Sequence, residues 1–355
     1  MTKKKILVLY SLPPPYLPNG SPDTPGRESV LFRLNAVRKA LLSLGHKVKT
    51  LEAKGDLLSL VKAIQSSRAD LIFNLCEEFI GRTRMEMNIA ALLELMEIPF
   101  TGSSAIVLGL SQDKGKTKSL FAHCGIPTPA YRVWLSGKDG QVDGLRFPLI
   151  VKPLKEDASL GIDNDAVVQN IKTLRQRVKI IHQAYRQPVL VEEYIEGREL
   201  NVSIIGNEKP QVLPISEIDF STMPPEKPKI CGYSAKWLED SQEFVHTVPR
   251  CPADLSPKLG KKVLQVSLQA YRTMECRDYA RVDIRLSLEG TPFVLEINAN
   301  PDISPDAGMI RSSRTAGFTY PEFIGRIVEL AQARSTSPFA YLQKKKISPK
   351  RKPGA

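Results

Sequence analysis

Two stretches within residues 279–300, YARVDIRLSLEGTPFVLEINAN, have the pattern of β-strands and form an expected hairpin over 279–298, with the Glu-Gly pair at 289–290 as the turn between them. That turn sets two pairs of side chains opposite each other: Asp283 with Glu296, and Arg281 with Asn298. Because side chains alternate between the faces of a strand, all four project from one face of the hairpin. Two opposed carboxylates repel each other unless a cation or a proton lies between them.

These side chains offer the chemistry of a metal site. Oxygen donors from Asp, Glu and Asn, without His or Cys, suit Mg²⁺ or Mn²⁺ better than Zn²⁺. Mg²⁺ seldom has a complete cage of protein ligands and usually keeps water or substrate phosphates. The pattern therefore indicates a phosphate-bearing substrate, most economically ATP. The alternative is an ordinary exposed hairpin face with alternating charges.

Three other stretches place charged side chains at the ends of regular elements. Lys152 ends the apolar run PLIVKP, and Lys114 lies early in the helix-like QDKGKTK. The run VLVEEYIEGREL ends a strand with Glu192 and Glu193 and resumes with Glu199 after a glycine. Taken singly, each has a simpler explanation, because Lys152 could extend its ammonium group to solvent and Lys114 could be surface charge.

The first hundred residues alternate between strand and helix. Strand patterns occur in KKILVLY, HKVKTLEA and ADLIFNL, and helical patterns span residues 28–44, 56–67 and 84–96. This order predicts a parallel sheet with right-handed crossovers, which is an α/β arrangement.

The rest of the chain mixes helices with shorter strands. We expect a helix from Ala105 to about Cys124, the strand FPLIVKP, the loop LKEDASLGI and a helix over 164–185. Three strand-rich runs follow, PVLVEEYI, RELNVSIIG and KPQVLPISEIDF, and then a Pro/Lys-rich loop. Further helices are expected at 254–274 and 320–333, on either side of the hairpin. The C-terminal part is therefore α+β.

Composition excludes several classes of protein. The chain has 355 residues, 42% hydrophobic and 25% charged, which fits a globular protein of two or three domains. No apolar run is long enough to cross a membrane, and MTKKKILVLYSL indicates a first strand rather than a signal peptide. Five scattered cysteines form no CxxC pair, which favours a reducing, cytoplasmic environment over disulfides or a zinc site.

The net charge of +12 raises the question of nucleic acid. The tail from Gln343, QKKKISPKRKPGA, holds six Lys/Arg and no acid, so the remainder carries +6. We expect residues 338–355 to form a basic, disordered tail, and contact with a polyanion is the less favoured alternative.

Together and in this order, the motifs resemble the ATP-grasp superfamily and, within it, the D-alanine–D-alanine ligase family. The matching segments, which span most of the chain, are LSQDKGKTK, PLIVKP, VLVEEYIEGREL, SAKW, ARVDIR, VLEINANP and AGFTYPEFIGRIVELA. The resemblance implies an N-terminal αβα domain (1–104), a central ATP-grasp subdomain with a lid loop (105–188) and a C-terminal subdomain with the metal site (189–337). ATP would lie between the two subdomains.

The resemblance also implies roles for individual residues, with ATP and two Mg²⁺ (or Mn²⁺) ions as cofactors. The expected ATP contacts are Lys114, Lys152, Ser159, Gly161, Glu192, Glu193, Tyr194, Ile195, Glu199 and Lys236. The expected metal ligands are Asp283, Glu296 and Asn298, and the expected catalytic residues are Arg281, Lys236 and Glu28. A substrate carboxylate would attack the γ-phosphate to give an acyl phosphate, and a second substrate's amine would then displace phosphate.

The sequence departs from the family pattern where the amino-acid substrates would bind. The positions of a family acid, serine and tyrosine fall at Gly26, Ala158 and Trp237, although Glu28 matches a family acid. A His-Gly pair is replaced at Cys76-Glu77, and a glycine and a serine are replaced near Asp302 and Ala307. Asp302, Arg311 and Arg314 are candidate substrate contacts, and the alternative for the two arginines is a place on a surface loop.

The sequence therefore predicts a ligase that joins some other carboxylate to some other amine, with amino acids or peptides as substrates. A genuine D-alanine–D-alanine ligase of peptidoglycan synthesis is the first alternative, and a catalytically silent ATP-binding regulatory module is the second. We expect no membrane partner, a cytoplasmic location and a homodimer, and nucleic acid is disfavoured as a partner.

Overall fold

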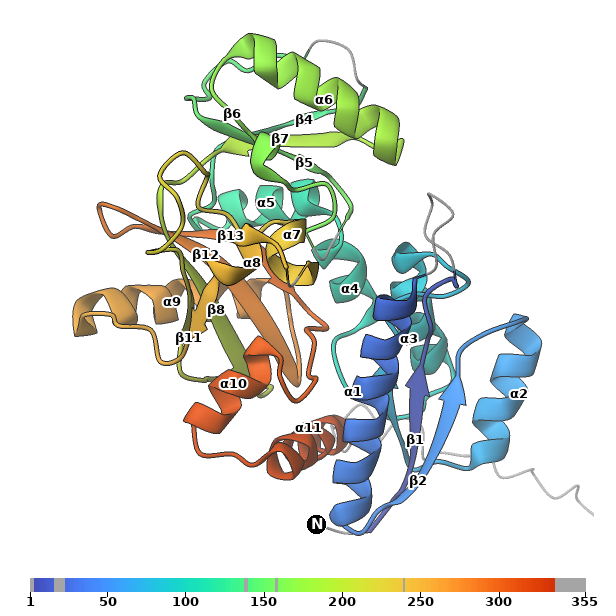
Figure 1. Cartoon of the computed structure of the whole chain (residues 1–355). Helices are drawn as coiled ribbons and strands as arrows, with labels where there is room; N and C mark the ends of the chain where they lie inside the picture. Colours follow the sequence, from blue (N-terminus) through green and yellow to red (C-terminus); the bar gives the residue numbers. More distant parts are fainter. Residues whose placement is uncertain (1–2, 16–22, 137–139, 157–158, 239, 336–355) are drawn as a thin grey trace, which may run out of the picture.

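The computed structural model describes residues 3–15, 23–136, 140–156, 159–238 and 240–335, which form three units (Figure 1). The first unit is a parallel sheet in the order β2-β1-β3, flanked by helices. It contains β1 (Lys5–Tyr10), α1 (Thr24–Ser43), β2 (Lys47–Glu52), α2 (Leu57–Ser67), β3 (Leu71–Leu75), the short 3₁₀ helix η1 (Thr83–Met85) and α3 (Glu86–Leu95). The parallel βαβαβα order expected from the sequence is confirmed.

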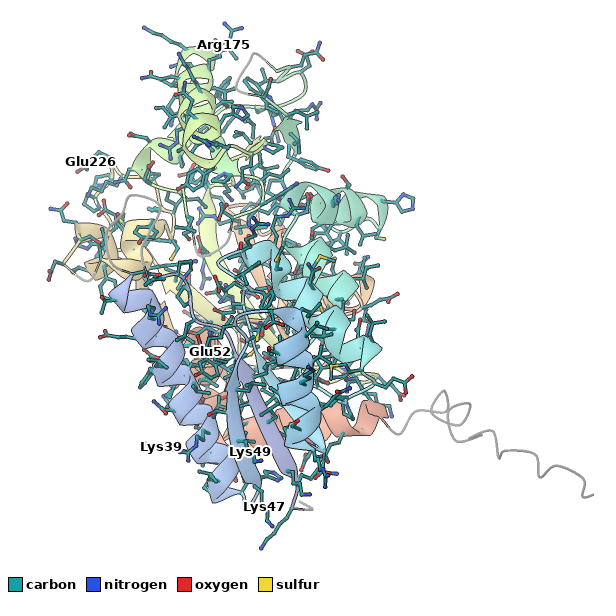
Figure 2. The ribbon with its side chains drawn as sticks, turned by 90° about the vertical axis from the view of Figure 1, so that its right-hand side faces the viewer. Lys39, Lys47, Lys49, Glu52, Arg175 and Glu226 are labelled. Atoms are coloured by element: carbon teal, nitrogen blue, oxygen red, sulfur yellow. The ribbon has the colours of Figure 1, made fainter. Side chains whose placement is uncertain are left out.

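Local sequence explains where these elements begin and how the sheet ends. The carboxylate of Asp56 accepts a hydrogen bond from the amide of Ser59 at 2.9 Å, which caps the start of α2. Strand β2 is an edge strand, and Figure 2 shows Lys47 and Lys49 on it, near Lys39 of α1. Lysines on an edge strand oppose pairing with the sheet of another molecule.

The second unit is an antiparallel sheet in the order β4-β7-β5-β6, covered by a helix. Its elements are α4 (Ala105–Ser111), α5 (Lys114–His123), β4 (Tyr131–Trp134), β5 (Leu149–Pro153), η2 (Asn164–Ala166), β6 (Val167–Val168), α6 (Ile171–Tyr185) and β7 (Val189–Glu193). Helix α6 packs Leu174, Val178 and Ile181 on one face of the sheet. Charged side chains such as Arg175 stand on its other face (Figure 2).

The third unit is a larger antiparallel sheet in the order β11-β10-β8-β12-β13, with β9 paired to β8. Its elements are β8 (Gly197–Ile205), β9 (Gln211–Val212), β10 (Ser216–Asp219), α7 (Tyr233–Trp237), α8 (Gln242–Val245), β11 (Val248–Arg250), α9 (Pro257–Thr273), β12 (Tyr279–Ser287), β13 (Pro292–Asn298), α10 (Gly308–Thr315) and α11 (Tyr320–Ser335). No helix within the described ranges is long and apolar enough to cross a membrane.

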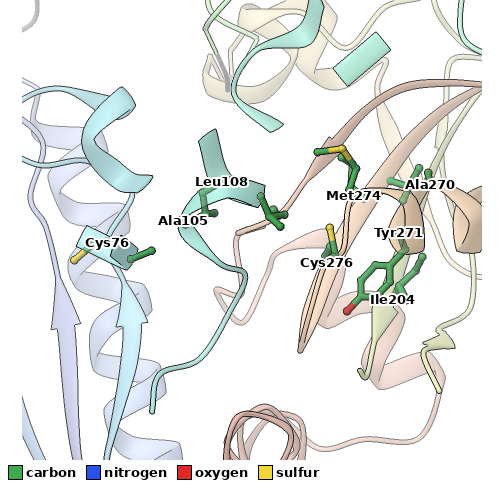
Figure 3. Close-up of a cluster of buried hydrophobic side chains, with 14 of the residues drawn as sticks. Cys76, Ala105, Leu108, Ile204, Ala270, Tyr271, Met274 and Cys276 are labelled. Carbon is green, nitrogen blue, oxygen red and sulfur yellow. The ribbon is translucent and has the colours of Figure 1, made fainter. Parts of the chain in front are cut away.

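Buried apolar clusters join the units. One cluster includes Cys76 of the first unit, Ala105 and Leu108 of α4, and Tyr271 of α9 (Figure 3). A second cluster joins α1 to α11, which lies beside it (Figure 1). These clusters cross the expected domain boundaries, so core packing does not mark where one domain ends and the next begins. The boundaries therefore remain predictions.

Several elements differ from the sequence-based expectations. The single helix expected from Ala105 to Cys124 is two helices, because the carboxylate of Asp113 caps the start of α5 through the amide of Lys116 at 3.1 Å. The helix expected over 164–185 begins only at Ile171, after η2 and β6. The sequence patterns did not predict β4, β6, β11, α7, α8 or α10, all of which are short.

Candidate active site

The hairpin has the expected register where the charged residues stand. Asp283 lies opposite Glu296, and Arg281 lies opposite Asn298. Nearer the turn the register shifts by one residue, so that Ile284 lies opposite Val294. The prediction of one uniform register was therefore wrong, because a β-bulge adds one residue to β13.

Strand β8, on the other side of β12, completes a polar face. Asn201 is paired with Asp283, and Glu199 is paired with Arg285. Since paired residues of neighbouring strands project from the same face, β8, β12 and β13 each contribute to one surface. The bulge also brings Leu295, next to Glu296, into the lining of the cavity above this surface.

Asp283 is held by two side chains. Arg281 donates Nε–H to Oδ1 at 2.7 Å and Nη2–H to Oδ2 at 2.8 Å. The Asn201 amide donates to Oδ1 at 2.8 Å. Burial would lower the pKa of Arg281, but the carboxylate of Asp283 outweighs it and raises that pKa. Arg281 is therefore a fixed cation beside the metal-ligand candidates.

Glu296 faces a group of lysines. The Nζ atom of Lys114 lies 3.2 Å from Glu296 Oε2, and it also donates to the Glu156 carbonyl at 2.6 Å. Burial would raise the pKa of Glu296, but Lys114, Lys152 and Lys236 lower it below its ordinary value. The carboxylate is thus ionised and lies in a positive field.

A buried charge network supports Lys152. Glu192, at the end of β7, lies between Lys152 Nζ at 2.6 Å and Lys118 Nζ at 2.7 Å. The Glu192 and Lys118 side chains are each 1% exposed. Burial would raise the pKa of Glu192, but the two lysines lower it. Sequence reasoning missed Lys118, although it lies one helical turn after Lys114 and would share its face of a helix.

Arg285 organises the segment between β7 and β8. Its side chain is 4% exposed and donates to the carbonyls of Ile195 and Lys229, both at 3.0 Å. It also contacts the carboxylate of Glu199 at 3.3 Å, and its guanidinium stacks over the ring of Tyr194. Sequence reasoning missed this residue too. The alternation that singled out Arg281 and Asp283 places Arg285 on the same face of β12.

One cavity collects most of the predicted site. The predicted residues that line it are Lys114, Lys152, Ser159, Glu192, Glu193, Tyr194, Ile195, Glu199, Lys236, Asp283 and Glu296. Apolar side chains complete the lining, namely Ile150, Ile162, Ile230 and Leu295. The cavity is therefore lined by apolar side chains together with charged side chains from β5, β7, β8, β12 and β13.

The lid loop is described in part. Ser159 lines the cavity with a positive φ of 60°, and its hydroxyl donates to the Cys231 carbonyl at 2.8 Å. Gly161 is not among the lining residues; a Cβ there would lie 2.7 Å from the ring of Pro153. Ala158 and the side chain of Trp237, two of the expected departures from the family, lie outside what the structure describes.

The other predicted residues lie outside the cavity lining. Glu28 is exposed on α1, and Asn298 accepts a hydrogen bond from the Asn300 amide at 3.0 Å. Arg311 donates to the Asp306 carbonyl at 3.3 Å, and Arg314 is exposed. The two arginines belong to helix α10 and not to a loop, and their role as substrate contacts stays a prediction.

Two of the departures from the family meet in space. The guanidinium of Arg33, on α1, contacts Glu77 after β3 and Asp302 after β13. The Arg33 side chain is 7% exposed, whereas those of Glu77 and Asp302 are 44% and 46% exposed. Burial would lower the pKa of Arg33, but the two carboxylates raise it. This cluster was not expected, because the sequence singled out Glu77 and Asp302 but not Arg33.

Gly26, another departure from the family pattern, has a local explanation. Gly26 lies in the first turn of α1, where its amide donates to Asp23 Oδ1 at 3.1 Å. A Cβ at this position would lie 2.6 Å from the Asp23 carboxylate. A larger side chain would therefore disturb the cap of α1.

Comparisons with known proteins agree with this architecture. The family model described as "D-ala D-ala ligase C-terminus" matches residues 120–329. A D-alanine–D-alanine ligase of Desulforudis audaxviator is 30% identical over 312 residues, covering 87% of this chain and 95% of that protein. An uncharacterised protein of Sinorhizobium fredii, y4sG, is 36% identical over 84% of this chain and 87% of its own length.

A solved structure shows the same fold. The D-alanine–D-alanine ligase of Bacillus anthracis, crystallised with ATP, superposes with a TM-score of 0.73 at 21% identity, covering 94% of this chain and 98% of the other. The chain therefore belongs to the D-alanine–D-alanine ligase family, the ATP-dependent carbon–nitrogen ligases with the ATP-grasp fold.

Proposed function

We propose that the protein is an ATP- and Mg²⁺-dependent ligase that joins a carboxylate to an amine through an acyl phosphate, with substrates other than two D-alanines. The observation that carries the proposal is the single cavity in which Asp283 and Glu296 face Lys114, Lys152 and Lys236. Cations and carboxylates arranged in this way suit a metal–nucleotide complex better than a neutral ligand.

ATP fits the mixed apolar and charged lining of the cavity. An adenine ring would lie among Ile150, Ile162 and Leu295, with the segment between β7 and β8 at its edge. The triphosphate would extend toward Lys114 and Lys152, whose ammonium groups are fixed by Glu296 and Glu192. The ATP in the Bacillus anthracis ligase supports this placement by analogy of fold.

The donor set fits Mg²⁺. Asp283, Glu296 and Asn298 offer hard oxygen ligands, and each carboxylate oxygen can accept more than one partner. Within the described residues, no three His, Cys, Asp or Glu side chains form a ready metal cage. Oxygens from phosphate or water would therefore complete the coordination. Bound there, Mg²⁺ would act as a Lewis acid on the phosphate groups.

The residues of the chain have separate tasks in the two steps. Lys114 and Lys152 would bind the phosphates while a substrate carboxylate oxygen attacks the γ-phosphorus and ADP leaves. The amine of the second substrate would then add to the acyl phosphate carbonyl, lose its proton and expel inorganic phosphate. Arg281, whose place Asp283 fixes, would stabilise the negative oxygen that develops on that carbonyl. Lys236 is exposed on α7 and would add its positive charge over the phosphates.

The Arg33 cluster supports altered specificity. Glu77 and Asp302 stand where the family pattern has a glycine in each case, and both carboxylates are held on one buried guanidinium. One cation and two carboxylates leave a net negative charge on this cluster. A substrate pocket at this position would suit a substrate carrying a cationic amine.

D-alanine–D-alanine ligation is the second candidate. It is favoured by the 30% identity to the Desulforudis ligase over 87% of this chain. We further propose a cytoplasmic location, because the five cysteines are all unpaired, and a homodimer, which rests on the family resemblance alone.

The test is a phosphate-release screen over pairs of D- and L-amino acids with ATP and Mg²⁺, followed by mass spectrometry of the products. A mixed product with little D-alanyl-D-alanine supports the proposal, and a preference for two D-alanines supports the second candidate. ATP binding without phosphate release for any pair would instead indicate the silent regulatory module.

A further inference from the structure

Lys118 is a buried cation that the proposed chemistry does not use directly. Its side chain is 1% exposed on α5, and its Nζ atom lies 2.7 Å from Glu192 Oε2. The same Nζ donates to the Thr128 hydroxyl at 2.9 Å. Lys118 does not line the cavity, so it has no direct route to a ligand there.

Glu192 connects Lys118 to a lysine that does line the cavity. Glu192 Oε1 accepts a hydrogen bond from Lys152 Nζ at 2.6 Å, and Oε2 lies against Lys118. With Lys152 alone, the glutamate would form a neutral pair and would cancel the charge that the cavity presents. Burial lowers the pKa of Lys118, and contact with the Glu192 carboxylate opposes that shift. With both lysines protonated the trio carries a net positive charge, and each lysine contacts only one carboxylate oxygen.

Helix α5 also fixes the relative place of the two sheets. Lys114 and Lys118 lie one turn apart, and they reach Glu296 on β13 and Glu192 on β7 respectively. The Thr128 hydroxyl, which accepts from Lys118, donates in turn to the Val294 carbonyl at 2.8 Å. One helix thus holds two of the strands that contribute carboxylates to the cavity, β7 and β13.

We propose that Lys118 is a positioning residue for the phosphates of ATP: it holds Glu192 so that the ammonium group of Lys152 keeps its charge and its free N–H donors toward the cavity. This inference rests on the proposed use of ATP. Lys118 acts through Lys152 and not on the adenine ring, so its effect is confined to ligands that carry phosphates.

Calorimetric titration of ATP and of adenosine separates this role from a general structural one. We expect Lys118→Met to weaken ATP binding by about tenfold and to change adenosine binding by less than about twofold. In a Lys152→Met background the same substitution should change ATP binding by less than about twofold, because the residue through which it acts is gone. Lys118→Arg, which keeps the charge and can fold where Met does not, should stay within about threefold of the wild type for ATP.

Three results would overturn the inference. The first is wild-type ATP affinity in a folded Lys118→Met protein. The second is an equal loss of ATP and adenosine affinity in Lys118→Met. The third is the same tenfold loss of ATP affinity when Lys118→Met is added to the Lys152→Met protein. If the wild type itself bound no ATP, the proposed function would fail as well, so the two failures can be told apart.

Discussion

Asp283 and Glu296 lie directly opposite each other on the β12–β13 hairpin, yet each carboxylate is paired with a different cation. Arg281 binds both oxygens of Asp283 from the same strand, whereas Lys114 reaches Glu296 from the start of α5. These two cations relieve the repulsion expected between opposed carboxylates. Both carboxylates are therefore held in place in the folded chain, and a metal–nucleotide complex would bind to carboxylates that are already positioned.

Removal of the amide of Asn298, a proposed metal ligand, should abolish turnover without unfolding the protein. For Asn298→Ala, we expect amino-acid-stimulated ADP release to fall by at least about a hundredfold, because charge stabilisation at the phosphates would be lost. A coupled ADP assay over a range of Mg²⁺ concentrations measures this. Glu289→Gln, an exposed change at the turn of the same hairpin, is the control. Turnover in Asn298→Ala equal to that of the control would contradict the metal assignment.

The Arg33 cluster should affect the amino-acid substrates and not the nucleotide. We expect Glu77→Gln and Asp302→Asn each to raise the KM of the amine substrate by about tenfold, because each change removes one negative charge from the proposed pocket. ATP affinity should change by less than about twofold. Steady-state kinetics with the pair found in the screen, beside ATP titration, measures both. The control is Glu52→Gln, which removes a carboxylate of the same unit that pairs with Lys54. Equal effects on ATP and on the amine would sink this account of specificity.

The segment that carries Lys236 should loosen in acid. Glu243, on α8, accepts hydrogen bonds from Lys227 Nζ at 2.8 Å and from the Asn164 amide at 2.7 Å. Its pKa is lowered to about 2, first by the hydrogen bond from Lys227 and then by that from Asn164. Since the folded pKa is depressed, the stabilisation is complete above the unfolded pKa of 4.5 and is lost as the pH falls through about 2.

NMR titration of the Glu243 carboxyl carbon checks that direction. At neutral pH, Glu243→Gln should raise amide hydrogen exchange in α7 and α8 and leave exchange in α9 unchanged. An ordinary Glu243 pKa, or unchanged exchange in α7 and α8, would show that this contact does not hold the segment.

The C-terminal helix should stabilise the whole chain through one buried ion pair. Asp278 is 0% exposed and accepts hydrogen bonds from Arg334 at 2.9 and 2.6 Å and from the Gly102 amide at 2.9 Å. We expect Arg334→Met to lower the free energy of unfolding by about 3–5 kcal/mol, because it leaves a buried carboxylate without its cation.

Chemical denaturation of matched variants of α11 measures this cost. Arg326→Met removes an exposed pair with Glu329 on the same helix and should cost no more than about 1 kcal/mol. If the two substitutions cost the same, the buried pair would have no special part in joining α11 to the rest of the chain.

Residue alternation was enough to predict the centre of the site. The spacing of Arg281 with Asp283 and of Glu296 with Asn298 fixes which face each side chain occupies, whatever the register of the hairpin. The bulge at Leu295 was not predictable. Alternation shows which face of its own strand a residue occupies, but it does not show that one strand of a pair contains an additional residue.

The remaining parts depend on contacts between distant segments. Arg33 joins Glu77 to Asp302 only after the first and third units have packed together, and no local pattern marks it. Lys118 and Arg285 did carry local signals, a helical turn after Lys114 and a same-face position after Asp283. Short elements such as α10 have too few residues to show a helical period.

In the proposed reaction, transfer of the γ-phosphoryl group activates a substrate carboxylate. The most direct measurement uses the substrate pair found in the screen, with the carboxylate labelled with ¹⁸O, and mass spectrometry of the inorganic phosphate released from unlabelled ATP. The acyl phosphate route predicts that the phosphate released in each turnover carries one ¹⁸O from the labelled carboxylate. Phosphate released without label while the amide product forms would contradict it.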